Sequence, residues 1–519
     1  MRKRRIQRSK LPKAKTVRQA DKIEKKIANL EQEILESHKK DRIRKENDAV
    51  SAILSNSKAF FKYAKQTNNK YCDIGPLVNE NGDLENDPKG KSEILRKQYE
   101  KVFSTKKPDT EIKIDKDNSD NGIHIDDFFN NEDATFTDIT ISEDDVKRAI
   151  EETRINSAPG DDCVPPILLH QCKNQLLKPL TTIMNKSIKT GFIPDIWKEA
   201  IVTPIFKKGL KELPSNYRPV SLTSQIAKLL ERIIRWYLVE YLETNNAFPE
   251  TQHGFRPSRS TVSQLLEHYD EIIDALERNS NIDIVMLDFC KAFDKISISI
   301  LLKKLKLLGI SGNIAKWIAN FLIKRKQKIV VNKQSSQWSE VKSGVPQGTI
   351  LAALLFLIYI ADIGNEVKHS SLASYADDSK LKKIIESSSD AEKLQDDLNK
   401  VYQWTHDNIM EFNVAKFEIL RIGQNENLKS ETSYLTPDGK PIPENDVIKD
   451  LGILFNKYGN FDDQLKVKIA KCNKMCGYIL RTFVTREAGP MMSLFRSLVV
   501  PIMDYGIGRN RPSQPSCPS

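Results

Sequence analysis

The sequence predicts an α/β (α+β) fold, and three stretches carry this prediction. Residues 142–145, Ser-x-x-Asp, resemble a capping box that begins a helix. Residues 261–264, Thr-x-x-Gln, give a second start, and apolar side chains recur at helical spacing through residues 262–276. The apolar stretch 284–287 follows at once and has the composition of a buried strand that ends at Asp288. Helices on each side of short strands indicate a layered fold.

The N-terminal part of the chain is predicted to be basic and helical. Residues 1–26 carry twelve basic and two acidic side chains. Ile23, Ile27, Leu30 and Ile34 stand at helical spacing and form one apolar stripe, which indicates a helix and allows a short coiled coil. The basic run fits a nuclear address, an RNA-binding arm or a solvated linker, and the sequence does not decide between them.

Composition divides the chain into five segments. Asn81-Gly82 is a turn signal in a small connecting module, and residues 109–133 are acidic, rich in Asn and without periodicity, as in a flexible linker. The five segments are a basic and helical N-terminal segment (1–46), a connector module (47–107), an acidic linker (108–141) and two folded segments (142–425 and 426–519).

Charge and cysteine content limit the partners. The chain holds 81 Lys and Arg against 70 Asp and Glu, a net charge of +11 that is compatible with a polyanionic partner. The seven cysteines form no CxxC pair and no zinc-finger spacing, so we expect reduced, intracellular thiols. The longest apolar run, residues 350–361, is shorter than the roughly 20 residues that cross a bilayer, so we expect no membrane partner.

Three features carry chemistry when they are taken together. Asp288 ends an apolar strand, residues 344–348 (Gly-Val-Pro-Gln-Gly) introduce an apolar helix, and residues 375–378 (Tyr-Ala-Asp-Asp) occupy a predicted strand-to-strand turn. Adjacent aspartates at a tight turn repel each other unless cations bind them. A nucleotidyl-transfer site uses clustered carboxylates to hold two divalent ions, and oxygen ligands with a triphosphate favour Mg²⁺. The turn alone could be an exposed loop, but the three features in this order indicate nucleotidyl transfer.

Six short segments stand in a fixed order along the chain: NYRPVSL (216–222), HGFRPSRST (253–261), LDFCKAFDKI (287–296), SGVPQGTIL (343–351), SYADD (374–378) and KDLGI (449–453). Together they resemble the reverse transcriptase of non-LTR (LINE-type, jockey-like) retrotransposons. The resemblance covers roughly residues 142–495, and residues 47–104 resemble the region that precedes the polymerase in such elements.

This resemblance implies a right-hand polymerase fold with fingers, palm and partial thumb, preceded by a helical and acidic N-terminal extension. Residues 142–425 would form the fingers and palm, and residues 426–519 the primer grip and partial thumb. The implied activity is RNA-directed DNA polymerisation, in which a DNA primer is extended on an RNA template from dNTPs with two Mg²⁺ ions, or with Mn²⁺ in their place. We expect an intracellular protein, present in nucleus and cytoplasm as a ribonucleoprotein.

The resemblance also assigns roles to single residues. It implies metal ligation and catalysis by Asp288, Asp377 and Asp378, a general acid at Lys416, nucleotide binding by Lys207, Arg218, Phe289, Phe293 and Gln347, and a primer grip at Leu451 and Gly452.

Several of these roles have a structural alternative. Phe289 would act through its carbonyl group, and Phe293 would exclude a ribose 2′-hydroxyl or else belong to the core. Lys207, with Lys208 as its alternative, and Lys416 could also be ordinary solvated lysines.

Three neighbours of the implied site have expectations of their own. Gly344 and Gly348 would let the backbone approach nucleic acid closely. Asp294 is expected to be a cap or an ion-pair partner.

The chain departs from the family pattern at three places. Ala352-Ala353 replaces the usual Gly-Pro, residues 158–163 differ from the usual APGPDG, and residues 509–519 match nothing expected. The alternative function is a decayed or domesticated nucleic-acid-binding module without catalysis, and the alternative enzyme is a group II intron or telomerase polymerase. We also expect a shortened thumb. We expect no endonuclease domain, because residues 1–141 show no constellation of catalytic His, Asp and Glu.

Overall fold

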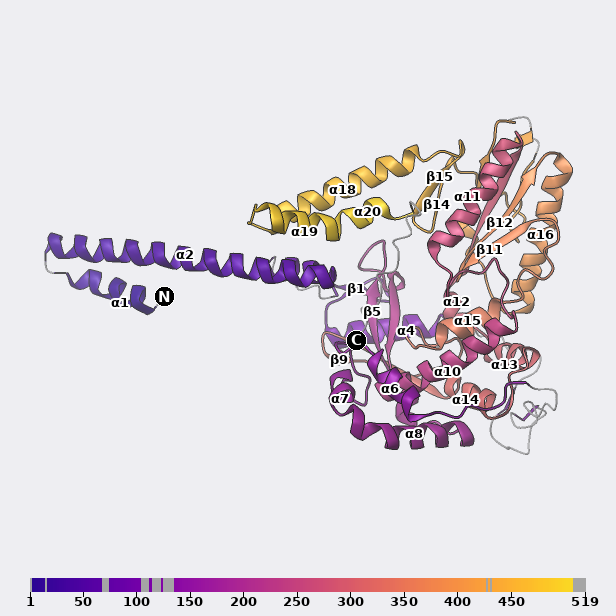
Figure 1. The fold of residues 1–519 in the computed structure, drawn as a ribbon, viewed down its shortest axis with the longest axis horizontal. Helices are drawn as coiled ribbons and strands as arrows, with labels where there is room; N and C mark the ends of the chain where they lie inside the picture. The colour runs from indigo at the N-terminus through magenta and orange to yellow at the C-terminus, as the bar shows by residue number, and fades with distance from the viewer. Residues whose placement is uncertain are drawn as a thin grey trace, which may run out of the picture. The chain divides into compact units, whose positions relative to one another are not determined.

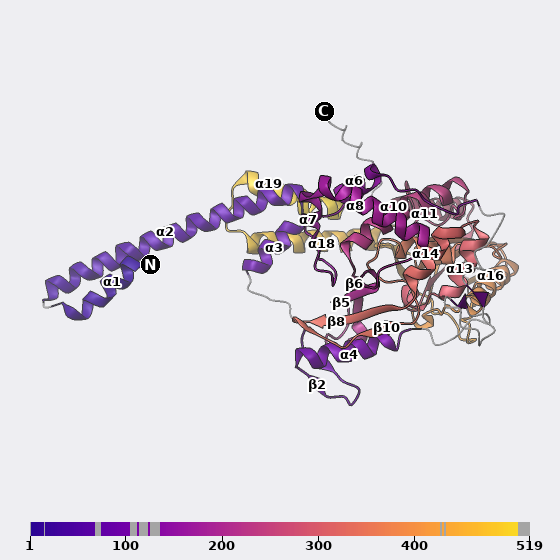
Figure 2. The ribbon, with the colours of Figure 1, turned by 90° about the horizontal axis from the view of Figure 1, so that it is seen from below.

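The computed structural model describes residues 2–14, 16–67, 74–103, 112–113, 123–124, 135–425, 428–429 and 432–506. Its backbone contacts divide the chain into two compact units, which we call the helical unit (1–72 with 461–519) and the sheet unit (73–460). In Figures 1 and 2 the helical unit combines indigo and yellow ribbons, because its helices come from the two ends of the sequence.

The first sheet of the sheet unit has four antiparallel strands in the order β11-β12-β7-β13. The strands are β7 (Asn281–Asp288), β11 (Ser371–Tyr375), β12 (Asp378–Ile385) and β13 (Glu418–Ile422). The predicted strand 284–287 is confirmed and begins earlier, because Asn281 already pairs with Ile385 of β12. Strand β7 lies between two neighbours and is buried along most of its length, which explains its apolar sequence.

The second sheet has five strands, with the path β10-β8-β5-β6 and β9 paired to β8. The strands are β5 (Glu199–Phe206), β6 (Tyr217–Leu222), β8 (Arg325–Val331), β9 (Gln334–Ser335) and β10 (Ser339–Val341). Helix α4 (Pro88–Glu100) packs on this sheet, and its Leu95 and Tyr99 share a core cluster with Val202 and Ile329. Helix α4, which belongs to the predicted connector module, is therefore part of the fold that surrounds this sheet.

Short strands form three further pairs in the sheet unit. The antiparallel hairpin of β1 (Leu77–Val78) and β2 (Leu84–Glu85) confirms the turn predicted at Asn81-Gly82. The other two pairs are β3 (Ile112–Lys113) with β4 (Ile123–His124), and β14 (Val447–Asp450) with β15 (Ile453–Asn456). Apart from β3, β4 and residues 135–141, the predicted acidic linker 108–141 lies outside the described residues.

Helices of the sheet unit cover the two sheets around one large core. They are α6 (Glu143–Glu151), α7 (Pro166–Gln171), α8 (Lys173–Thr190), α9 (Asp195–Lys198), α10 (Gln225–Thr244), α11 (Thr261–Glu277), α12 (Ala292–Lys295), α13 (Ile298–Leu307), α14 (Gly312–Leu322), α15 (Ala352–Ile360) and α16 (Ser388–Asp407), with the 3₁₀ turns η2 (Pro214–Asn216) and η3 (Val414–Lys416). Helix α15 is buried on nearly every side, as its uniformly apolar sequence indicates.

Two helix starts test the predicted capping signals. Ser142 caps α6 and forms the predicted capping box with Asp145. The second start was predicted one residue too late: Ser260, not Thr261, caps α11, and its partner is Ser263. Gln264 is instead a buried side chain, because the helix turns it towards the sheet unit's interior.

The helical unit contains α1 (Arg2–Lys10), η1 (Leu11–Lys13), α2 (Val17–Ser55), α3 (Lys58–Thr67), α18 (Asp462–Thr482), α19 (Ala488–Leu498) and α20 (Val500–Asp504). The predicted N-terminal helix is confirmed as α2. Its C-terminal end shares a core cluster with α3, α18 and α19, in which Ile53, Phe60, Phe483 and Leu494 are buried. The contact-based division thus differs from the predicted boundaries at 46 and 107, because this apolar cluster joins the two ends of the chain.

The fold class is confirmed as a mixed helix and sheet fold. In the part of the chain that the structure describes, the cysteines are free thiols. Within the same residues, no helix combines the length and apolar character that crossing a membrane requires.

Candidate active site

The predicted catalytic aspartates meet at one edge of the four-stranded sheet. Strand β7 ends at Asp288, and the antiparallel strand β12 begins at Asp378, its direct partner in the register. Tyr375 pairs with Asp378 across the turn that carries Ala376 and Asp377. Direct partners on neighbouring strands present their side chains to the same face. The structure therefore brings together Asp288 and Asp378 from distant parts of the sequence and places Asp377 in the adjoining turn.

The carboxylates at this edge of the sheet repel one another. Burial, together with the negative charges of Asp377, Asp288 and Asp450, raises the pKa of Asp378 to about 6. Lys416 opposes this rise, and its Nζ lies 2.5 Å from Oδ2 of Asp288. A carboxylate cluster that repels itself in this way suits a bound cation.

Asp288, Asp377 and Asp378 are the residues that could hold Mg²⁺. As the side chains stand, no group of three or more His, Cys, Asp or Glu in the described ranges is gathered closely enough to hold an ion. One carboxylate of the set, Asp288, is paired with the Lys416 ammonium group. The donor set fits a hard cation because it consists of carboxylate oxygens.

The turn between β11 and β12 is held by a segment for which the sequence suggested no role. Oε1 of Gln252 accepts hydrogen bonds from the backbone N–H of Ala376 at 3.0 Å and of Gly254 at 2.9 Å. Ala376 has the left-handed φ of +59°. A Cβ on Gly254 would lie 2.3 Å from the Ala376 nitrogen, so a larger residue would push the turn away.

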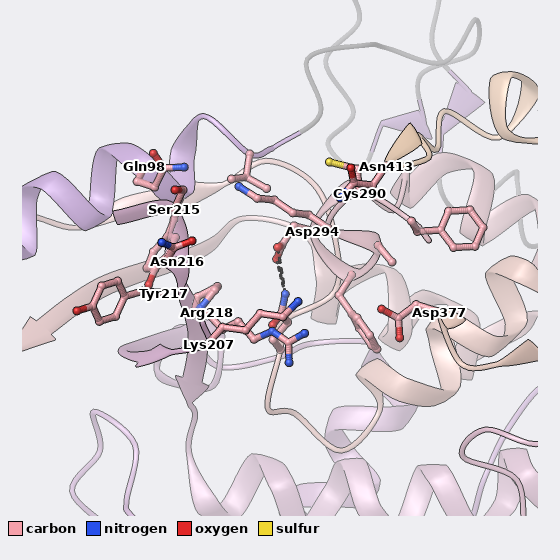
Figure 3. A pocket seen from close by; sticks show the side chains of 18 of the residues that line it. Gln98, Lys207, Ser215, Asn216, Tyr217, Arg218, Cys290, Asp294, Asp377 and Asn413 are labelled. Carbon is pink, nitrogen blue, oxygen red and sulfur yellow. Dashed lines mark hydrogen bonds between the residues drawn. The ribbon is translucent and has the colours of Figure 1, made fainter. Parts of the chain in front are cut away.

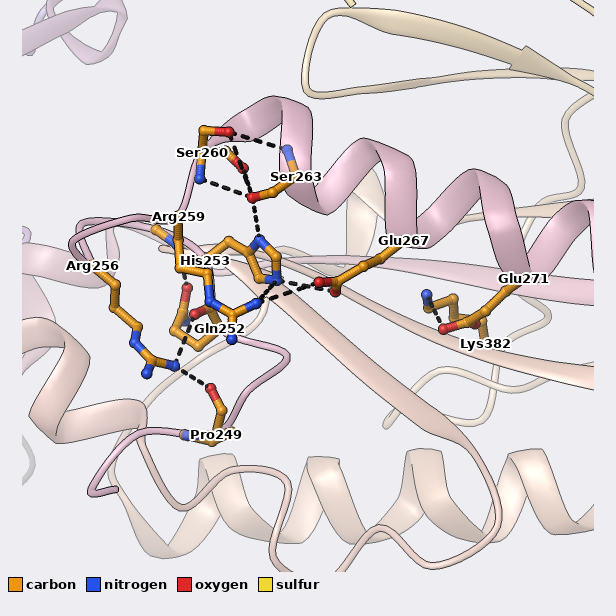
Figure 4. A network of polar contacts seen from close by, with 11 residues as sticks. Pro249, Gln252, His253, Arg256, Arg259, Ser260, Ser263, Glu267, Glu271 and Lys382 are labelled. Carbon is orange, nitrogen blue, oxygen red and sulfur yellow. Dashed lines mark hydrogen bonds and ion pairs between the residues drawn. The ribbon is translucent and has the colours of Figure 1, made fainter. Parts of the chain in front are cut away.

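Behind this segment lies a polar network from the HGFRPSRST motif (Figure 4). His253 contacts Ser263 Oγ through Nδ1 at 2.8 Å and Glu267 through Nε2 at 3.0 Å. Arg256 donates to the Pro249 carbonyl group at 2.6 Å and pairs with Glu243. The motif thus anchors the Gln252 segment between α10 and α11. The signal that could have revealed it is Gln252, which directly precedes the HGFRPSRST motif.

A cavity of about 720 Å³ opens beside the aspartates (Figure 3). Its lining contains all the predicted catalytic and nucleotide-binding residues: Asp288, Asp377, Asp378, Lys416, Lys207, Arg218, Phe289, Phe293 and Gln347. Leu451 and Gly452 are outside this lining.

Four further lining residues come from α4 and the turn that follows it: Gln98, Tyr99, Val102 and Phe103. No role was predicted for these four residues. The signal that could have found them is the apolar pair Leu95 and Tyr99, four residues apart, which fixes one face of α4 on the second sheet.

Cationic side chains converge opposite the aspartates. Lys207 directly follows β5, and Arg218 lies on the neighbouring strand β6. Burial lowers the pKa of Lys207, and the nearby charges of Arg218 and Lys416 lower it further, while Asp288 raises it. Figure 3 shows Lys207 and Arg218 on one side of the cavity and Asp377 on the other. Lysine and arginine groups in this position can bind phosphate oxygens.

The two predicted aromatic residues lie on the cavity wall. Phe289 is buried and stacks on Phe412 with 4.7 Å between ring centroids. Phe293 stacks on Phe356 at 4.8 Å and packs against the large core, yet it also lines the cavity. One face of the Phe293 ring thus belongs to the core, and the residue still borders the space where a nucleotide would lie.

The loop that carries Gln347 is clamped against α12. Nε2 of Gln347 donates to both carboxylate oxygens of Asp294, at 3.1 and 3.0 Å. The expectation that Asp294 caps a helix or forms an ion pair was therefore wrong, because the carboxylate faces the amide of Gln347 instead. Burial raises the pKa of Asp294 to about 6.

The glycines of this loop approach protein backbone closely. A Cβ on Gly344 would lie 2.5 Å from the Phe293 carbonyl oxygen, and one on Gly348 would lie 2.8 Å from that of Ser221. Both glycines have positive φ, +84° and +106°. Their close approach serves the packing of the loop on α12 and β6, and the expected approach to nucleic acid stays a prediction.

The predicted primer-grip residues Leu451 and Gly452 form the turn of the β14-β15 hairpin, with φ of +44° and +93°. Asp450, which precedes them, forms a buried ion pair with Lys380 of β12. Lys380 stands two positions after Asp378 on the same strand, so this ion pair fixes the hairpin beside the aspartates.

Comparisons with known proteins identify similar sequences. The family "Reverse transcriptase (RNA-dependent DNA polymerase)" matches residues 205–454. The probable RNA-directed DNA polymerase from transposon BS of Drosophila melanogaster is 28% identical over 70% of this chain and 41% of its own length. The RNA-directed DNA polymerase from mobile element jockey of the same organism is 25% identical over 70% of this chain and 41% of its own length.

A solved structure of apo telomerase from Candida tropicalis, truncated from its C-terminal domain, is 12% identical. It covers 54% of this chain and 60% of that one with a TM-score of 0.36, a likeness that carries no argument about fold or function. The chain spans about 41% of the length of the two transposon proteins. Residues 205–454 thus match the reverse transcriptase family, and the chain is similar to the RNA-directed DNA polymerases of these two mobile elements.

Proposed function

We propose that the chain is an RNA-directed DNA polymerase of a non-LTR retrotransposon, which extends a DNA primer on an RNA template from dNTPs. One observation carries this proposal. Asp288 and Asp378 are cross-strand partners at one wall of a cavity, and Lys207 and Arg218 lie on the other side of it. Carboxylates that hold divalent cations and cations that bind phosphate are the two requirements of nucleotidyl transfer.

In this proposal the fold has the parts of a polymerase hand. The four-stranded sheet with β7 and β12 is the palm, and the five-stranded sheet with β5 and β6 is the fingers. Helices α18 to α20 form the thumb, and the β14-β15 hairpin is the primer grip. The cross-strand aspartates support the palm assignment, and Lys207 and Arg218 support that of the fingers.

In this proposal, each residue that lines the cavity has its own role in the reaction. Asp288, Asp377 and Asp378 would hold Mg²⁺, which supplies activation of the primer 3′-hydroxyl and neutralisation of phosphate charge when bound. Lys207 and Arg218 bind the triphosphate, and Lys416 gives a proton to the departing pyrophosphate. Phe293 stands under the sugar and excludes a 2′-hydroxyl. Leu451 and Gly452 position the primer end.

A nucleic-acid-binding module without catalysis remains the alternative, and primer extension separates the two. Purified protein is incubated with a DNA primer on an RNA template, dNTPs and Mg²⁺. The proposal predicts products longer than the primer that require both the template and all four dNTPs. Retention of the primer–template in a gel shift without any extension would favour the alternative.

A further inference from the structure

Glu231 is a fully buried acid that has no part in the proposed reaction. It lies on α10, whose Leu230 and Ile234 belong to the large core, and none of its surface is exposed. Burial raises the pKa of Glu231, whereas hydrogen bonds from backbone N–H groups and the charges of Arg325 and Lys228 oppose this rise. A carboxyl group in an apolar core costs free energy unless its partners compensate, so Glu231 depends on its contacts.

The partners of Glu231 are backbone N–H groups at the start of α15. Its Oε2 accepts from Ile350 at 2.7 Å and from Leu351 at 3.2 Å, across about 120 positions of sequence. Within the residues that the structure describes, the other oxygen, Oε1, has no hydrogen-bond partner. The first N–H groups of a helix have no partner inside the helix, and Leu351, the N-cap of α15, makes no side-chain cap. Glu231 therefore caps α15 from another helix.

The same part of the chain holds the loop before α15 at a second point. Ser221 on β6 donates its N–H to the carbonyl oxygen of Gln347 at 2.8 Å. Strand β6 is followed by α10, so Ser221 and Glu231 belong to one β6–α10 segment, which also carries Arg218. The chain after α15 forms β11 and then the turn with Asp377. The two contacts thus join the segment of a proposed phosphate ligand to the segment that leads to the aspartates.

We propose that Glu231 is a positioning residue that holds α15 against the β6–α10 segment and so sets the spacing between Arg218 and the aspartates of the cavity. The inference rests on the proposed function. A nucleotide triphosphate has a fixed reach, so Arg218 and the aspartates can bind it together only at one spacing. Glu231 supplies an acceptor oxygen at the required reach. Loss of the acceptor or of its reach should weaken nucleotide binding and leave primer–template binding unchanged.

The test measures the apparent Kd of dTTP. A primer that ends in a dideoxynucleotide, annealed to an RNA template, lets the next nucleotide bind without reacting. The dTTP-dependent retention of the protein on this primer–template gives the Kd, and retention without dTTP reports primer–template binding. The Kd of dTTP is a property of the folded protein, so a loss of stability alone does not change it.

Three variants separate the acceptor from its reach. Glu231→Met has a similar size but no acceptor, so two backbone N–H groups lose their partner and the Kd should rise about tenfold or more. Glu231→Asp keeps the acceptor but withdraws it by one methylene group, and the Kd should rise about fivefold. Glu231→Gln keeps an acceptor at the same reach, so its Kd should stay within about twofold of wild type.

The matched control is Glu46→Met. Glu46 is also a fully buried glutamate that accepts from two backbone N–H groups, those of Val484 and Thr485. It belongs to the helical unit, whereas the lining of the cavity belongs to the sheet unit. Glu46→Met should therefore lower thermal stability and keep the wild-type Kd of dTTP.

Distinct results contradict the inference and the proposed function. A wild-type Kd in Glu231→Met would overturn the positioning role, and a wild-type Kd in Glu231→Asp would do so if Glu231→Met does not fold. An equal rise in Glu46→Met would also overturn it, because loss of any buried glutamate would then weaken nucleotide binding. So would a rise in Glu231→Gln as large as that in Glu231→Asp. The absence of any dTTP-dependent retention of wild type would contradict the proposed polymerase function, and this inference with it.

Discussion

Gln252 holds the backbone of Ala376 by a 3.0 Å hydrogen bond, across 124 positions of sequence. The same Oε1 accepts from Gly254, so one buried side chain satisfies two backbone donors beside the turn between β11 and β12. Ala376 keeps a left-handed conformation, in which a residue with a Cβ is strained. The geometry of Asp377 and Asp378 thus depends on a residue that touches neither.

Gln252→Met removes this acceptor while preserving the size of the side chain. We expect kcat for primer extension to fall about tenfold or more, because a misplacement near 1 Å at a reacting centre has effects of this size. Two buried N–H groups would lose their partner, at a cost of about 1–3 kcal/mol each in unfolding free energy. The matched control is Gln264→Met, which alters another buried glutamine on α11. Equal kcat values for the two variants would show that the turn does not need Gln252.

Lys416 pairs with Asp288 at 2.5 Å, so its removal should have opposite effects on catalysis and on cation binding. In Lys416→Gln, loss of the proposed proton donor should lower kcat about 10²-fold. Asp288 would also lose its ion-pair partner, so the Mg²⁺ concentration for half-maximal activity should fall. A Mg²⁺ titration of primer extension measures both effects.

The control for Lys416 is Lys393→Gln, because Lys393 forms a comparably exposed ion pair with Asp390 at 3.2 Å on α16. This variant should match wild type in both parameters. A rise in the Mg²⁺ requirement of Lys416→Gln would mean that the lysine supports the cation site and does not compete with it.

Phe293→Val should increase ribonucleotide incorporation relative to deoxyribonucleotide incorporation, because the ring borders the cavity while its other face packs on Phe356. We expect the ratio of kcat/KM values for dNTP and rNTP to fall about tenfold or more, since steric exclusion of one hydroxyl then disappears. Phe321→Leu, in a buried ring stacked on Trp317, controls for a loss of stability alone. Unchanged sugar selectivity in Phe293→Val would leave Phe293 as a core residue.

Glu46 ties the two ends of the chain together within the helical unit. It is fully buried and accepts from the backbone N–H of Val484 at 2.8 Å and of Thr485 at 2.9 Å. Glu46→Ala leaves these donors without their partner, so we expect about 1–3 kcal/mol lower stability and faster proteolysis near residue 484. Limited proteolysis and thermal unfolding measure this.

Glu33→Ala on the exposed face of the same helix is the control for Glu46 and should behave as wild type. Equal protease resistance of the two variants would mean that the N-terminal helix does not stabilise residues 461–506.

Local patterns predicted much of the fold and singled out the aspartates that meet at the edge of the four-stranded sheet. The capping box at Ser142 and the apolar strand before Asp288 act over a few residues, so composition and spacing reveal them. The start of α11 shifted by one residue because Ser260 and Thr261 can both cap a helix, and Ser260 has the extended conformation that a cap needs.

The missed features depend on contacts between distant residues. Asp294 and Gln347 are hydrogen-bonded although they are 53 positions apart in the sequence. Glu46 and Thr485 are hydrogen-bonded across 439 positions. Periodicity carries no information on such pairs. The place of α4 at the cavity was missed for the same reason, since it follows from packing of Leu95 and Tyr99 on strands that come much later in the sequence.

The most direct test of the account is primer extension by Asp377→Asn, compared with wild type and with Asp396→Asn. Asp377 lies in the turn between β11 and β12 and lines the cavity, whereas Asp396 is exposed on α16. The substitution changes charge with little change in volume, so folding, followed by thermal unfolding, and RNA binding should remain near wild type. We predict that extension on an RNA template is abolished in Asp377→Asn and retained in Asp396→Asn. Extension by Asp377→Asn at the wild-type rate would contradict the assignment of this cavity as the polymerase site.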